Sequence, residues 1–343
     1  MSEKIEKYYS QKRIKELENA VTRKVNSILE QLVQILSNDI YISPNKNITS
    51  NLLLRQRIQD LRSKLTSDMK SIVSAYMLKG QELANIKNEK VIEQFTKNIV
   101  VPEGIKQAWK FDIQGVDLRK LSGKIWKLSE DYFSMIELTL NAGMYDGISA
   151  VEIAKDLRKL LNNPNNLNIN ELRRLGIENA GGLRKYREIE KKILNYKPGR
   201  GIYKSAKKNA LRLARNEINI AYRRQDQQNR EKLEFVVGQT VKLSASHPRE
   251  DMCDFLQGDY NKNFQFTGWH PQCICYVVNK TVSKEEFKEF LTTGEIKTPQ
   301  TVGIPNSAKT WIKDNSEYLT KTKNKPYWID DNFKNDLNLK KGL

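Results

Sequence analysis

Residues 203–230 read YKSAKKNALRLARNEINIAYRRQDQQNR, which predicts one helix of about 28 residues. At about 100° per residue, its apolar side chains gather on two sides. One side carries Leu211, Ala214, Ile218, Ala221 and Tyr222. Leu213 and Ile220 fall nearly opposite that set. A helix that is apolar on two sides is packed from two sides, so we expect it at the centre of its domain.

The N-terminal hundred residues carry apolar side chains at spacings of three and four between charged positions, as amphipathic helices do. A first helix is predicted at 2–38 and a second at 50–98, with turn-forming residues at 43–47 between them. Together they predict an antiparallel hairpin. Packing of the two helices on each other is the expected arrangement, and coiled-coil binding to a partner is the alternative.

Helical patterns continue between the hairpin and the central helix. A third helix is expected at 117–141. Ser149 and Glu152 have the spacing of a capping box, which predicts a helix at 150–162, and another helix is expected at 184–195. The chain is therefore predicted to be helical up to and through the central helix.

The pattern changes after the central helix. Residues 235–243 and 276–278 are rich in β-formers and predict a small β element. Ser283 and Glu286 form a second capping box, ahead of a short helix that ends near Thr292. The tail beyond is polar and rich in Lys and Asn, so we expect it to be extended and to gain order by lying on a partner.

The predicted fold class is mainly α, with a long helical N-terminal hairpin and an α+β C-terminal domain that contains a small β element stapled by Cys and His. Four parts are expected along the chain. They are a helical hairpin at 1–100, a helical connector at 101–148, the C-terminal domain at 149–280, and a short helix with an extended tail at 281–343.

The chain is strongly basic. Its 343 residues include 59 Lys and Arg against 41 Asp and Glu, a formal net charge of +18. Residues 184–232 hold 16 Lys and Arg against 5 Asp and Glu, a net +11. Such charge attracts a polyanion, so double-stranded DNA bound without sequence preference is the expected partner, with solubility alone as the alternative. The expected contacts are Lys204, Lys207, Lys208, Arg212, Arg223 and Arg224.

Composition also sets the expected compartment. The sequence has no run of about 18 apolar residues, and its N-terminus is charged where a secretory signal would turn apolar. We therefore expect no membrane span and synthesis in the cytoplasm. Three cysteines, an odd number, argue against a disulfide framework and for thiols that are free or metal-bound.

Both histidines and all three cysteines lie between positions 247 and 275. Thiolate and imidazole are ligands that zinc prefers, and four of them in a tetrahedron can hold an irregular segment. The preferred ligand set is Cys253, His270, Cys273 and Cys275, with His247 as a substitute for His270. One alternative is a packed core of free thiols with a turn ordered by His270. A catalytic Cys–His pair is a further alternative, although no oxyanion loop accompanies it.

Three motifs follow one another in this half of the chain: LARNE at 213–217, CDFLQG at 253–258 and WHPQCIC at 269–275. Their order and spacing resemble the C-terminal domain of the Mu F-like head-morphogenesis proteins. The resemblance covers roughly positions 149–279, under half of the chain. Its most specific part is the His-Pro-x-Cys-x-Cys ending.

The chain departs from the family pattern at three positions. Asn216 replaces the Thr of an Ala-Arg-Thr-Glu motif, and Ile274 replaces the Arg of His-Pro-x-Cys-Arg-Cys. Glu250 stands where the family has the first Cys of Cys-x-x-Cys-x-x-Leu-x-Gly. By this resemblance, His247, Glu250 or His270 would have to supply the additional metal ligand.

The resemblance implies a minor structural protein of a tailed-phage head. Its expected partners are the portal protein, capsid or other head proteins, and genome DNA. Its expected location is the virion, in the capsid interior near the portal vertex, after a stage in the host bacterial cytoplasm. Arg215 and Glu217 of the helix motif are expected to form structural ion pairs, with phosphate binding by Arg215 as the alternative.

The sequence contains no Gly-rich phosphate loop, no His-Glu-x-x-His and no deaminase motif, so we expect no enzymatic activity. Two other functions stay open. One is a toxin-type effector enzyme fused to a head-morphogenesis domain, which would need a catalytic constellation outside the Cys/His region. The other is a zinc-stapled DNA-binding regulator, which would bind specific bases.

Overall fold

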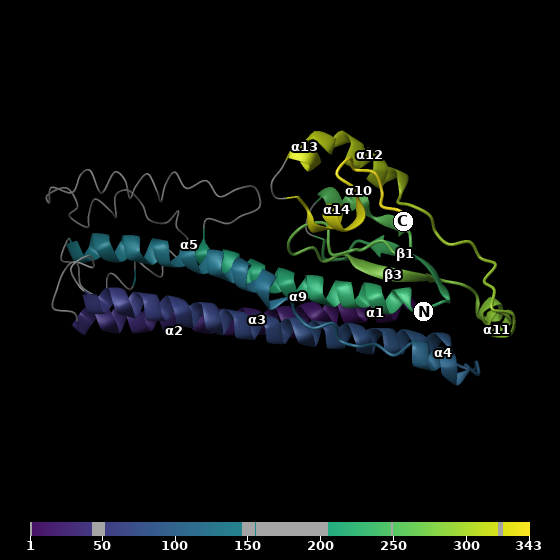
Figure 1. The fold of residues 1–343 in the computed structure, drawn as a ribbon, viewed down its shortest axis with the longest axis horizontal. Helices are drawn as coiled ribbons and strands as arrows, with labels where there is room; N and C mark the ends of the chain where they lie inside the picture. Colours follow the sequence, from purple (N-terminus) through teal and green to yellow (C-terminus); the bar gives the residue numbers. More distant parts are fainter. Residues whose placement is uncertain (1, 43–51, 146–154, 156–204, 248–249, 322–324) are drawn as a thin grey trace. The chain divides into compact units, whose positions relative to one another are not determined.

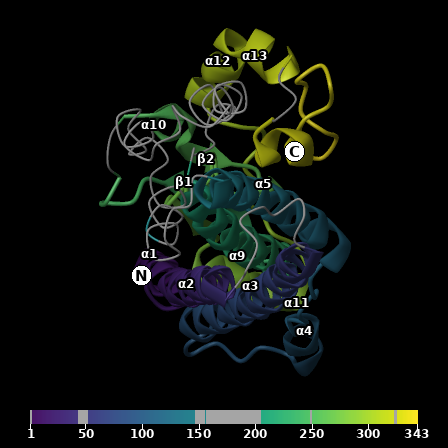
Figure 2. The same ribbon diagram turned by 90° about the vertical axis from the view of Figure 1, so that its left-hand side faces the viewer.

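The computed structural model describes residues 2–42, 52–145, 155, 205–247, 250–321 and 325–343 (Figures 1 and 2). The chain divides into two compact units. The first comprises Met1–Asn19, Tyr76–Val116 and Asn216–Leu343, and the second comprises Ala20–Ala75 and Asp117–Arg215. The described part is mostly helical, with long N-terminal helices and a small antiparallel sheet beside a Cys/His cluster, which confirms the predicted fold class.

The two long N-terminal helices are present as predicted. α1 (Ser2–Lys12), the π-helical segment η1 (Arg13–Glu18) and α2 (Asn19–Ile42) follow one another without a break, and α3 (Leu52–Phe95) comes next. In the second unit, α2 and the beginning of α3 lie side by side in both views (Figures 1 and 2). The predicted turn at 43–47 lies outside the described residues.

The second unit is a helical bundle whose buried positions recur every three or four residues. They include Val21, Val25, Leu29 and Leu32 of α2, Ile58, Leu61, Leu65 and Met69 of α3, and Leu121, Ile125, Phe133 and Ile136 of α5 (Leu118–Tyr145). Burying each of these side chains contributes roughly 1.5–3 kcal/mol. α5 confirms the helix predicted at 117–141, whereas those predicted at 150–162 and 184–195 lie outside the described residues.

The first unit contains a three-stranded antiparallel sheet with strand order β2-β1-β3. β1 (Val236–Lys242) and β3 (Tyr276–Thr281) lie where the sequence predicts β structure. β2 (Gly258–Tyr260) was not predicted, because three residues show no resolvable alternation of apolar and polar side chains. Residues 243–275, which contain the whole Cys/His cluster, join β1 to β3 and include β2.

α9 (Ala206–Glu231) confirms the predicted central helix. In its last part, which belongs to the first unit, every residue from Asn216 to Arg230 is buried except Arg224 and Gln228. This burial includes charged side chains as well as apolar ones. Neighbouring elements therefore surround this part of α9, as its two apolar sides predict.

A chain of buried ion pairs crosses the first unit. Lys87 of α3 lies 2.9 Å from the Glu6 carboxylate of α1 and also contacts the carboxylate of Asp226. Asp226 in turn lies 2.6 Å from Arg230, which donates to the Asn279 amide oxygen on β3 at 2.6 Å. Removing one partner of such a pair costs about 3–5 kcal/mol, because it leaves a charge buried alone. These contacts fix α1, α3, α9 and β3 together.

The predicted extended tail is wrong for the described residues. After α11 (Lys284–Thr293), the segment forms α12 (Asn306–Asp314), α13 (Ser316–Lys321) and α14 (Tyr327–Asn332). Trp328 is 1% exposed, and its indole nitrogen donates to the Trp269 carbonyl at 3.2 Å. Trp328 and Phe333 of the tail thus belong to the domain's own core, and Trp311 packs against it. The polar composition of the tail gives no sign of this.

No helix among the described residues combines the length and the apolar character that crossing a membrane would require.

Candidate metal centre

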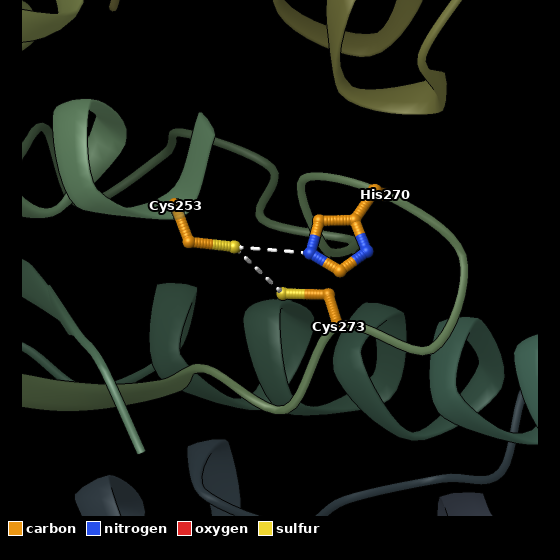
Figure 3. A group of neighbouring side chains, drawn as sticks. All are labelled: Cys253, His270 and Cys273. Carbon is orange, nitrogen blue, oxygen red and sulfur yellow. Dashed lines mark hydrogen bonds between the residues drawn. The ribbon is translucent and has the colours of Figure 1, made fainter. Parts of the chain in front are cut away.

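Three potential metal ligands converge in the first unit (Figure 3). Cys253 lies on α10 (Met252–Leu256), while His270 and Cys273 come from the segment between β2 and β3. The Sγ of Cys253 lies 3.2 Å from Nε2 of His270 and 4.0 Å from Sγ of Cys273. With Zn–S near 2.3 Å and Zn–N near 2.0–2.1 Å, tetrahedral ligand atoms are separated by about 3.5–3.8 Å. The observed spacing brackets this value, so the cluster could bind a metal ion such as zinc.

Asp251 and Asp254 hold the Cys253 end of the site through a capping box on α10. The Asp251 carboxylate accepts from the Cys253 amide at 2.7 Å, and the Asp254 carboxylate accepts from the Asp251 amide at 2.8 Å. This second bond, aided by His247, holds the pKa of Asp254 below its usual range. The cap orients the first turn of α10, so the Cys253 thiol has a defined direction.

His270 is oriented by its own neighbour. Its Nδ1 lies 2.8 Å from the Pro271 carbonyl oxygen. A carbonyl can only accept, so Nδ1 carries the proton, and in the neutral ring the lone pair is on Nε2. Nε2 is the atom that faces Cys253, and metal-bound histidines are typically fixed in this way by a hydrogen bond at the other ring nitrogen.

Two residues of α9 donate hydrogen bonds to the backbone around Cys273. Nη2 of Arg223 donates to the carbonyls of Cys273 at 2.9 Å and Cys275 at 2.7 Å. Nδ2 of Asn219 donates to the same Cys273 carbonyl at 3.1 Å. The loop also depends on Gly268, whose φ is +103° and where a Cβ would lie 2.2 Å from Nη1 of Arg223. The guanidinium therefore takes the space that any other side chain at position 268 would need.

The third thiol, Cys275, is fully buried in the same core as Cys253 and Cys273. The three thiols influence one another's ionisation. Burial raises the pKa of Cys273, but hydrogen bonds from Cys253 and Cys275, with the nearby Arg223 charge, outweigh it and hold this pKa well below its usual range. The bond to Cys273 raises the pKa of Cys253. One thiolate is thus stabilised first, and thiolate is the form that binds metal.

The structure separates the two residues proposed as substitute ligands. Glu250 is exposed and belongs to neither group of potential ligands. Its neighbour Asp251 lies closer to the cluster, with a carboxylate oxygen 3.3 Å from Nε2 of His270. His247 lies close to Asp251 and Cys253 in a second group. Asp251 was missed in the sequence, although an acidic residue two positions before Cys253 is a recognisable helix cap.

Arg223 was assigned to a DNA-binding surface, and this assignment is wrong. It is 4% exposed, because its guanidinium donates to the carbonyls of Cys273 and Cys275, in the cysteine loop, and lies 4.4 Å from the Phe266 ring centroid. Arg224 is exposed and lies 3.4 Å from Asp331. The basic segment at 184–232 therefore includes at least one buried arginine, and its net charge does not lie entirely on the surface.

Lys207, Lys208 and Arg212, three of the remaining predicted contacts, belong to the second unit. Lys208 is exposed, Lys207 is half-buried and 3.8 Å from the Glu30 carboxylate, and Arg212 is half-buried. Lys204 lies outside the described residues.

Arg215 and Glu217 of the LARNE motif differ in their surroundings. Nε of Arg215 donates to the Thr22 hydroxyl at 2.9 Å within the second unit. Glu217 is 6% exposed and belongs to the first unit. The contact of Arg215 is a hydrogen bond to a hydroxyl, and the structural ion pairs expected of both residues stay a prediction.

No protein-family model, curated protein or solved structure matches this chain. The function of the site therefore has to be inferred from its own residues.

Proposed function

We propose that the protein is a minor structural component of a tailed-phage head, whose C-terminal domain is held together by a zinc ion at Cys253, His270, Cys273 and Cys275. The observation that carries the zinc proposal is the convergence of Cys253, His270 and Cys273 on one point in the irregular connection between β1 and β3. The support for the head assignment is the motif series that ends in WHPQCIC.

The donor set and its burial favour a structural metal over a catalytic one. Cys253 and Cys273 are each 1% exposed and Cys275 is fully buried, whereas the His270 side chain is 31% exposed, so three of the four ligands are closed to solvent. Closed sites of four sulfur and nitrogen ligands are typical of structural zinc, whereas catalytic zinc keeps a position open for water. When bound, zinc would cross-link α10 to the loop gripped by Asn219 and Arg223.

Metal content of the native full-length protein tests this proposal. We expect one tightly bound zinc per chain by elemental analysis. Cys273→Ser should lose that zinc and unfold at a lower temperature, because it removes a ligand at the centre of the cluster. Glu250→Gln is the matched control, since Glu250 is exposed and lies outside the cluster. Native protein purified without chelator that contains no zinc would contradict the proposal.

The head assignment has a separate test. Co-expression with the portal protein of the same phage should give a complex that survives size-exclusion chromatography. An unrelated protein of similar positive charge controls for charge alone. If both proteins bind the portal equally, or neither does, the assignment to the head fails whatever the zinc content.

Genome contact remains part of the proposal, on a reduced set of residues. Among the predicted contacts that the structure describes, Lys208 and Arg224 are exposed. Affinity for duplex DNA should fall steeply with salt and be independent of sequence. Each phosphate contact contributes about 0.9 to the slope of log affinity against log salt, so replacing both residues by Gln should lower that slope by about 1–2. A slope near zero in the wild-type protein would exclude this role.

A further inference from the structure

The geometry points to a second metal position beside the first, held by His247, Asp251 and the Cys253 thiolate, which the two positions share. One ligand atom from each of these residues lies within 4.8 Å of the other two. This group adds two ligands to the cluster in Figure 3, which draws only Cys253, His270 and Cys273. The zinc staple proposed above uses neither His247 nor Asp251.

The Asp251 carboxylate is placed between the two histidines. Its Oδ1 lies 3.7 Å from Nε2 of His247, and its Oδ2 lies 3.3 Å from Nε2 of His270. Each oxygen thus faces a different imidazole, and Oδ1 is the oxygen on the side of His247. Oxygen and nitrogen ligands at about 2.0–2.2 Å from zinc are separated by roughly 3.3–3.6 Å in a tetrahedron, close to both distances.

A protonated His247 paired with carboxylates is the competing explanation. Nε2 of His247 also lies 3.1 Å from Asp254, so two carboxylates face this ring. An ion pair accounts for both aspartates, but it gives no reason for the Cys253 thiol to belong to the same group. A metal ion accounts for the Cys253 thiol, His247 and Asp251 together, because thiolate, imidazole and carboxylate are each zinc ligands, while Asp254 caps α10.

The two positions differ in their number of protein ligands, and this predicts different metal exchange. Exposure does not separate them, because the His270 side chain of the inner position is 31% exposed, against 12% for His247 and 29% for Asp251. A metal ion at the outer position has three protein ligands, so at least one of its coordination positions is open to water. Such a metal exchanges more readily than one held by four protein ligands. Its mixed donors suit borderline divalent ions such as zinc or cobalt.

The inference rests on the proposed staple only through the shared Cys253 thiolate. The test is titration of Zn²⁺, and separately of Co²⁺, into the full-length protein that already holds its first zinc, followed by calorimetry and by elemental analysis after gel filtration. We expect one further equivalent, bound more weakly than the first. His247→Ala should weaken this second equivalent by about 100-fold or more and leave the first in place, since even the partners of metal ligands are worth about 10–100-fold.

Glu250→Ala is the matched control and should keep both equivalents. Absence of a second equivalent in the wild-type protein overturns the inference, as does an equivalent that His247→Ala leaves unchanged. Loss of the first zinc from His247→Ala also overturns it, because His247 would then serve the inner position. Failure of the staple is seen separately, as native protein without zinc.

Discussion

Replacing Arg223 by Met should destabilise the first unit by about 3 kcal/mol. The guanidinium donates to the carbonyls of Cys273 and Cys275, and bonds that involve a charged group are worth about 1.5–3 kcal/mol each. In the variant, Asn219 still donates a hydrogen bond to the Cys273 carbonyl. The Cys275 carbonyl loses its bond to Arg223, and a buried carbonyl without a hydrogen bond costs about 1–3 kcal/mol. Methionine fills part of the space and limits the cavity.

Arg224→Met provides the control at the next position. Arg224 is exposed, and its contact with Asp331 at 3.4 Å is a surface ion pair worth about 0–1 kcal/mol. The free energy of unfolding of both variants should be measured in urea, with zinc present at a fixed concentration. Equal losses, within about 0.5 kcal/mol, would refute the proposed grip of α9 on the cysteine loop.

The two variants also separate stability from DNA binding. Arg224→Met should weaken DNA binding and leave the fold intact. Arg223→Met should change DNA affinity only as far as it unfolds the protein. If Arg223→Met instead weakened DNA binding without loss of stability, Arg223 would have the surface role that the sequence predicts.

Further outcomes follow from other contacts. Trp328→Ala should cost about 3–5 kcal/mol in urea unfolding, because it empties the core that the tail completes, and a loss below about 1 kcal/mol would mean that the tail is not packed there. Burial raises the pKa of Asp226, but Lys87 and Arg230 lower it more, so its contribution to stability is present above its unfolded pKa of about 4 and is lost as pH falls through the lower folded value. Lys87→Met should remove much of this acid dependence. Urea unfolding at pH values from about 2 to about 6 would check this. Gly268→Ala should lower both zinc retention and thermal stability, whereas Gly294→Ala, at a similarly positive φ but with open space around it, should cost only backbone strain and keep zinc.

The helices were predictable because their information is local. The long elements α2, α3, α5 and α9 bury side chains at spacings of three and four over many turns, so each pattern repeats often enough to be read without tertiary contacts. The clustering of every His and Cys between 247 and 275 likewise indicated the candidate site.

What the sequence could not provide depends on contacts between distant segments. The role of Arg223 is set by a loop some 50 positions away, and in the sequence it is one more basic residue in a basic run. The tail is predicted to be extended because it is polar and rich in Lys and Asn. Its short helices gain their stability from the core contributed by Trp269 and its neighbours, and isolated helices of that length are not stable.

The first unit is assembled from three separate stretches of the chain, and this has a consequence for the order of folding. The Tyr276 hydroxyl donates to the Glu3 carboxylate at 3.2 Å across a separation of 273 positions, and Glu6 reaches Asp226 through Lys87. During synthesis, α1 therefore leaves the ribosome long before its partners exist. The helices of the second unit form their backbone hydrogen bonds locally, whereas the sheet unit needs the last residues of the chain and should fold more slowly. In that interval Glu6, which the folded unit buries, is still hydrated, so its desolvation is completed only when Lys87 and Asp226 are in place.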